Sequence, residues 1–158
     1  MKLNFPRILF WLITILTSSI FWIPTYPPMI DVPQHAGQVS LLIDILKGGV
    51  DRTSEFDLNI LTPYWLGYGT WAFLSIWLPL TVALKALLSL TYLTFIASAV
   101  ALRKERQSDS RLDWLLIPSF FGFSFKFGFF TFLMAAPIVL LMLVIIFKYS
   151  KDPRSKHS

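Results

Sequence analysis

The sequence predicts an all-α fold, a multi-pass transmembrane helical bundle with about four to five apolar helices and one amphipathic interfacial helix. Two observations predict it. Hydrophobic residues make up 55% of the 158 residues and charged residues only 15%, against about 25% charged residues in typical soluble domains. The apolar residues also form long uncharged runs, and about 20 such residues in a helix cross the hydrocarbon core. We therefore expect one transmembrane domain over residues 1–149 and no separate soluble domain.

The first apolar run, at residues 8–24, follows the basic residues Lys2 and Arg7. Such a start is typical of either a cleaved signal peptide or an uncleaved first span. However, Trp22 and Pro24 close the run, and no A-x-A-like cleavage site follows them. The run is also long for the hydrophobic part of a signal peptide. We favour an uncleaved first span.

The second element is a short amphipathic helix at residues 32–47, which we expect on the membrane surface in the first outer loop. Asp31 stands at the N-cap position, and Pro33 suits the first turn because that turn needs no N–H from it. Gly48 and Gly49 are suited to end the helix. Apolar residues recur at helical spacing between these signals: Val32, Ala36, Val39, Ile43 and Leu46.

Two further apolar runs follow, at residues 64–78 and 80–102, separated by Pro79. The positive-inside rule places the N-terminus, the loop at residues 103–111 and the C-terminal tail in the cytoplasm, because all three are rich in Lys and Arg. The chain must then cross the membrane an odd number of times between the outer segment and that loop. We prefer a short re-entrant or interfacial segment at residues 64–78. The alternative is a full span there, with the loop outside.

The last apolar run, at residues 112–147, is too long for one span. Lys126 lies near its middle and indicates the apex of a hairpin. This divides the run into expected spans at residues 112–125 and 127–147. The basic tail at residues 150–158 is expected to be disordered.

The composition excludes several classes of function. The chain has 0 cysteines, which rules out disulfides, thiolate catalysis and cysteine-ligated metals. It contains no phosphate-binding loop, dinucleotide-binding fingerprint or nucleophile elbow. The net charge of +5 is modest and forms no basic stripe with interleaved aromatics, so we expect no nucleic-acid partner. The bilayer is the expected partner.

The most chemically suggestive stretch runs from Asp31 to His35. An aspartate just outside the membrane can act as a general base or bind a divalent cation, and His35 follows on the same helical face. The alternative is that Asp31 only caps the helix and His35 only sits at the interface. Asp51, Glu55 and Asp57 could also hold a cation, although a solvated loop is the simpler interpretation.

The aromatic and basic candidates have two interpretations as well. Tyr64 and Trp65 could stack on a sugar ring, or they could belong to an interfacial aromatic belt. Lys126 is a functional candidate because it interrupts an apolar run, but a lysine at a hairpin apex can also extend to the membrane surface.

The layout resembles the N-terminal part of the GT-C-class integral membrane glycosyltransferases. Asp31, Pro33, Gln34 and His35 follow the first span, and Pro63-Tyr64-Trp65 opens the next apolar run. The stretch from Gly128 to Pro137 is similar to the G-F-x-x-F-L-x-x-x-P pattern of uncharacterised bacterial membrane proteins of this type. The resemblance covers most of the chain.

The resemblance implies transfer of a sugar from a polyprenyl-phosphate-linked donor at the outer face of a bacterial inner membrane. Asp31 would be the catalytic or metal-positioning acid, and His35 would assist it or contact the acceptor. Lys126 would meet the lipid phosphate, and Tyr64 and Trp65 would bind substrate. Members of this class are several hundred residues long, so the resemblance also implies a truncated or partial form that is inactive by itself.

A different class of function stays open. About four spans can pack together but barely enclose a substrate, which favours a small non-enzymatic protein that binds or scaffolds a larger membrane complex. Its partner would be another membrane protein or a second copy of the chain. A transporter is a third interpretation, although the sequence lacks paired interrupted helices in two related halves.

Overall fold

The computed structural model describes residues 5–48, 59 and 61–151, and within these ranges every regular element is helical. Asp51, Glu55, Asp57 and the tail beyond residue 151 lie outside the described residues. The elements in chain order are α1 (Phe5–Ser18), η1 (Ser19–Trp22), α2 (Val32–Leu46), α3 (Trp65–Leu74), α4 (Leu80–Glu105), η2 (Ser110–Leu112), α5 (Asp113–Ser119), α6 (Phe123–Phe127) and α7 (Phe130–Lys151).

Three helical segments are long and apolar enough to cross a membrane: Phe5–Trp22, Leu80–Glu105 and Phe130–Ser150. Large apolar side chains stay exposed on all three, including Leu12 at 51% and Ile145 at 61%. A soluble protein rarely leaves such continuous apolar surface in water, whereas a bilayer requires it. The chain is therefore an integral membrane protein with several spans.

Several serine and threonine hydroxyl groups within the spans donate hydrogen bonds to carbonyls of their own helix. Thr14 Oγ1 donates to the carbonyl of Phe10 at 2.9 Å, and Ser89 Oγ donates to the carbonyl of Lys85 at 2.9 Å. A polar group without a partner is costly in hydrocarbon, so these internal bonds let polar residues occupy apolar spans.

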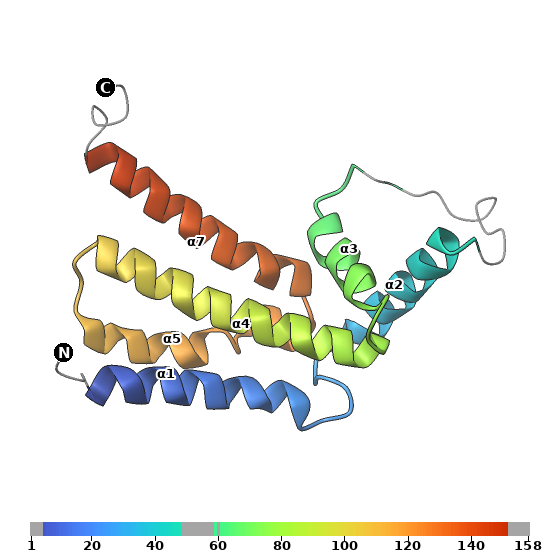
Figure 1. The fold of residues 1–158 in the computed structure, drawn as a ribbon, viewed down its shortest axis with the longest axis horizontal. Coiled ribbons are helices and arrows are strands. Elements are labelled where there is room, and N and C mark those ends of the chain that lie inside the picture. The colour runs from blue at the N-terminus through green and yellow to red at the C-terminus, as the bar shows by residue number, and fades with distance from the viewer. Residues whose placement is uncertain (1–4, 49–58, 60, 152–158) are drawn as a thin grey trace.

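The helices are arranged so that their termini gather at two opposite sides of the molecule (Figure 1). The start of α1, the end of α4 and the last turns of α7 lie toward one side, and α2 and α3 lie toward the other. We call the first the basic end, after Arg7, Arg103, Lys104 and Arg111, and the second the α2–α3 end. α4 packs along α7 and also contacts α1, α3 and α5.

Two of the apolar runs do not form a single helix long enough to cross a membrane. α3 has 10 residues, and a helix of that length rises about 15 Å, half of a hydrocarbon core of about 30 Å. The expected span at residues 112–125 is not one helix, because it consists of α5 with 7 residues and α6 with 5. Pro118 lacks the N–H that would continue the α5 ladder, and Gly122 is extended at ψ −156°.

A cluster of aromatic rings fills the space between η1, α4 and the link from α5 to α6. Phe21 is 1% exposed and stacks on Phe121 with ring centroids 5.8 Å apart. Phe120 meets Tyr92 edge to face at 5.3 Å. Each such pair contributes about 0.5–1.5 kcal/mol beyond the area that it buries, so the cluster fixes the broken segment against α4.

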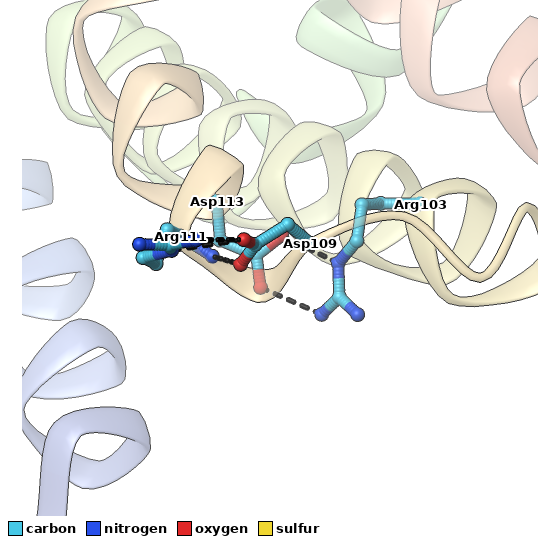
Figure 2. A network of polar contacts seen from close by, with 4 residues as sticks. All are labelled: Arg103, Asp109, Arg111 and Asp113. Carbon is cyan, nitrogen blue, oxygen red and sulfur yellow. Dashed lines mark hydrogen bonds and ion pairs between the residues drawn. The ribbon is translucent and has the colours of Figure 1, made fainter.

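A bidentate ion pair joins the last turn of α4 to the first residue of α5 (Figure 2). Arg103 Nε lies 2.9 Å from Asp113 Oδ1, and Arg103 Nη2 lies 2.7 Å from Asp113 Oδ2. The second pair in the figure joins Arg111 to Asp109, two residues earlier in the same loop. The first pair is largely shielded from solvent and therefore holds the α4–α5 turn more strongly than the exposed second pair.

Candidate functional site

The loop before α2 is joined to the junction between α6 and α7 by the backbone. The N–H of Ile30 donates to the carbonyl of Lys126, and the N–H of Asp31 donates to the carbonyl of Phe127, each at 3.1 Å. The apex expected from Lys126 therefore lies against the segment that carries Asp31, although the two are almost a hundred positions apart in the sequence.

Gly128 makes this close approach possible. It ends α6 with φ +90°, a left-handed conformation in which side-chain-bearing residues are strained. A Cβ at this position would lie 3.1 Å from the backbone nitrogen of Asp31 and 3.4 Å from the Asp31 Cβ. The absence of a side chain at Gly128 thus serves both the turn and the contact with Asp31.

Asp31 occupies the N-cap position of α2, yet its carboxylate makes no capping hydrogen bond. Its backbone carbonyl accepts the N–H of His35 at 3.0 Å, and Pro33 in the first turn has no N–H to cap. The side chain is half-buried. The Asp31 carboxylate therefore makes no hydrogen bond that caps α2, the role that the alternative interpretation gave it.

His35 is held between α3 and α7. Its Nδ1 lies 2.7 Å from the hydroxyl of Tyr68, and its ring meets Phe130 edge to face with centroids 5.1 Å apart. Phe130 is 1% exposed and thus forms a rigid wall. With Nδ1 occupied, Nε2 is the ring nitrogen that could contact an acceptor or a water molecule.

Tyr68 is the functional candidate that the sequence did not single out. It stacks on Tyr64 with ring centroids 5.7 Å apart, as expected for residues four positions apart on a helix. Burial raises the pKa of Tyr68, and the neighbouring Tyr64 raises it further. The phenol therefore keeps its proton at neutral pH and can share it with His35.

A small open pocket of about 140 Å³ lies beside Tyr68, the hydrogen-bond partner of His35. Its lining combines aromatic rings with amide and hydroxyl groups: Gln38, Leu42, Asn59, Thr62, Trp65 and Tyr68. Trp65 Nε1 donates to the backbone carbonyl of Asn59 at 3.1 Å, which fixes the indole at the rim. Aromatic faces beside polar groups form the kind of surface that holds a sugar ring.

A larger and mostly apolar groove of about 450 Å³ lies along α2. Its lining comes from the loop before α2 and from α2, α3 and α4: Tyr26, Val32, Ala36, Gly37, Ser40, Trp71, Leu80, Thr81 and Leu84. Val32 and Ala36 lie close to His35 on α2, and this helix contributes residues to both the groove and the polar pocket.

Comparisons with protein-family models, with curated proteins and with solved structures find no match to this chain.

The structure brings together most of the residues that the sequence proposed for the site. His35 reaches Tyr64 through Tyr68, and Trp65 lines the pocket beside them. Lys126 is exposed in the last turn of α6, and its backbone contacts the loop that carries Asp31. In the part of the chain that the structure describes, both ion pairs lie at the basic end and neither includes Lys126.

A divalent cation stays an expectation. Among residues 5–48, 59 and 61–151, no group of three or more His, Asp or Glu side chains is placed to hold a metal ion. Asp31 and His35 are two potential ligands from one helix end. The three acidic residues expected in the following loop, Asp51, Glu55 and Asp57, lie outside the described residues.

Proposed function

We propose that this chain is a glycosyltransferase-like membrane protein whose α2–α3 end receives a sugar linked to polyprenyl phosphate. One observation carries the proposal. The three segments that resemble the GT-C class, namely 31–35, 63–65 and 128–137, meet at this end, where Gly128 contacts Asp31 and Phe130 contacts His35. Asp31 lies against Gly128 at this meeting point, and its carboxylate makes no capping hydrogen bond to α2.

The proposed reaction uses the chemistry of these side chains in a simple way. A hydroxyl oxygen of the acceptor attacks the anomeric carbon, the bond from that carbon to the phosphate oxygen breaks, and polyprenyl phosphate leaves. Asp31 accepts the proton of the attacking hydroxyl, and His35 positions the acceptor. The ammonium group of Lys126 stabilises the phosphate, and the rings of Tyr64 and Trp65 pack on the sugar.

The surroundings of the site support a lipid-linked substrate. The apolar groove along α2 can receive a hydrocarbon chain, while the smaller pocket offers aromatic and amide groups to a polar ring. The positive-inside rule places the basic end in the cytoplasm, so the α2–α3 end would face outward from a bacterial inner membrane. Both termini would then be cytoplasmic.

Substitution of Asp31 by asparagine tests the proposal. In the full-length context, we expect Asp31→Asn to lower the transfer of radiolabelled hexose from polyprenyl phosphate by about 100-fold or more, because a general base contributes at least that factor. Asp44→Asn is the matched control, since Asp44 is exposed on the same helix and is absent from both pockets. Undiminished transfer by Asp31→Asn would remove Asp31 from the mechanism.

A second function is favoured by one feature of α7. Little of this span is buried, and it presents large exposed apolar side chains along one broad face: Ile138, Val139, Leu141, Met142, Ile145 and Ile146. Such a helix can pack on another membrane protein, which would suit a non-enzymatic binding or scaffolding role. A stoichiometric membrane partner that co-purifies with the chain and is lost on substitution of this face would favour that role over catalysis.

A further inference from the structure

A pocket of about 370 Å³ opens at the basic end, far along the helices from the α2–α3 end. It lies between the start of α1, the end of α4 and the loop that leads into α5. Its charged lining consists of four cationic side chains and one carboxylate: Arg7, Arg103, Lys104, Arg111 and Asp113. The lining therefore carries an excess of positive charge, which favours an anion.

The ion pairs of this region leave several cationic groups available. Arg103 uses Nε and Nη2 for Asp113, so its Nη1 keeps two N–H groups (Figure 2). Arg111 pairs with Asp109 but is 89% exposed in its side chain. Within the described part of the chain, Arg7 and Lys104 have no ion-pair partner. Together these groups can surround a phosphate from three structural elements.

The pocket lies at the ends of two helices that are long and apolar enough to be spans, the level at which a membrane would change from hydrocarbon to polar headgroups. Arg7 is in the first turn of α1 and Lys104 is in the last turn of α4, and both helices are long and apolar enough to be spans. The pocket floor is aromatic and apolar: Phe10, Trp11, Val100 and Trp114. Tryptophan is typical of this interfacial level.

Exposed apolar side chains flank the charged lining. Ile8 follows Arg7 on α1, Leu112 follows Arg111 in η2, and Leu115 is the third residue of α5. Their exposed fractions are 48%, 49% and 66%. A water-soluble anion gains nothing from these residues, whereas the acyl chains of a lipid would cover them.

We propose that this pocket binds the phosphate of an anionic glycerophospholipid and so anchors α1, α4 and α5 at the membrane surface. Arg7, Lys104 and Arg111 contact the phosphate, the Arg103–Asp113 pair forms the rigid back wall, and the acyl chains lie on the exposed apolar side chains of α1 and α5. The site is independent of the function proposed for the α2–α3 end, since it shares no residue with it.

Native mass spectrometry of the purified protein, titrated with phosphatidylglycerol or phosphatidylcholine, tests this site. We expect a one-to-one complex with phosphatidylglycerol that outlasts the phosphatidylcholine complex during activation in the gas phase. Each basic residue near a lipid surface contributes about fivefold in affinity, so Arg7→Gln with Lys104→Gln should weaken phosphatidylglycerol binding by about 25-fold. Arg111→Gln alone should weaken it by about fivefold.

Lys148→Gln is the matched control, because Lys148 is an exposed cation near the end of α7 and does not line the pocket. It should bind phosphatidylglycerol like the unsubstituted protein. Arg7, Lys104 and Arg111 are all exposed, and monodisperse elution of their variants verifies folding. Equal binding of the two lipids, or unchanged binding by the double variant, would overturn the proposal. Full displacement of the lipid by millimolar inorganic phosphate would instead assign the site to a free anion.

Discussion

Asp31 and Gly128 show how single residues position the candidate site. Asp31 takes the place of a helix cap without making the capping bond, so its carboxylate is available for other chemistry. Gly128 adopts φ +90° against the backbone of Asp31. The G-F-x-x-F-L-x-x-x-P pattern begins at this glycine, and the structure gives the physical reason for a glycine there. A residue with a Cβ at position 128 would be strained and would press on Asp31.

Gly128→Ala should therefore destabilise the protein. Forcing a side-chain-bearing residue into the left-handed region costs about 1–2 kcal/mol, and the new Cβ would press on the N–H of Asp31. The free energy of unfolding in mixed detergent micelles containing dodecyl sulfate measures the loss. Gly122→Ala is the control, because its φ is −79° and a Cβ there would meet only the Ser119 carbonyl, at 3.7 Å. Equal losses in both variants would argue against this role of Gly128.

Among the elements, the bounds of α2 could be predicted from the sequence, whereas its packing against α3 could not. Asp31, Pro33 and Gly48 mark the bounds of a helix, and the structure has α2 at Val32–Leu46. Its position on a membrane surface stays a prediction. The contact between His35 and Tyr68 could not be predicted, because periodicity describes one element and says nothing of which elements pack together.

The same limit of sequence periodicity explains why the break between α5 and α6, within residues 112–127, was not predicted. The composition of these residues is almost wholly apolar, so the sequence predicted one span at residues 112–125, with Lys126 at the apex of a hairpin. Pro118 and Gly122 were visible, but both residues also occur within membrane helices, where neighbours satisfy the freed backbone groups. Phe120 and Phe121, at this break, pack against Tyr92 of α4, a long-range contact that no local sequence pattern specifies.

The short length of α3 predicts that residues 64–78 do not cross the membrane completely. If residues 64–78 enter and leave on one side, then Leu61→Cys and Pro79→Cys should both react with a membrane-impermeant maleimide added outside intact cells. The chain has 0 native cysteines, so each variant carries a single reactive thiol. Ser108→Cys, in the basic loop after α4, should react only after permeabilisation. Labelling of Leu61→Cys from outside and of Pro79→Cys only from inside would instead establish a full span.

At the scale of the whole molecule, the two ends divide the chemistry. The basic end gathers cations from α1, α4 and η2 around a pocket, and the α2–α3 end holds the imidazole of His35 against Tyr68 and Phe130. The helices between them expose apolar side chains to the surrounding lipid. This separation was predictable in outline, because Lys and Arg cluster in the sequence between the apolar runs. The pockets themselves depend on side-chain packing that no sequence pattern specifies.

Photoaffinity mapping tests the central claim most directly, because it locates the donor lipid without requiring turnover. The purified chain in lipid nanodiscs would be irradiated with a polyprenyl-phosphate hexose that carries a diazirine on its first isoprene unit, and the modified peptides would be sequenced. We predict adducts in α2 and α3, along the groove lined by Ala36 and Trp71, with loss of labelling when unmodified donor competes. Adducts confined to the basic end, or spread over all lipid-exposed helices without competition, would contradict a donor site at the α2–α3 end.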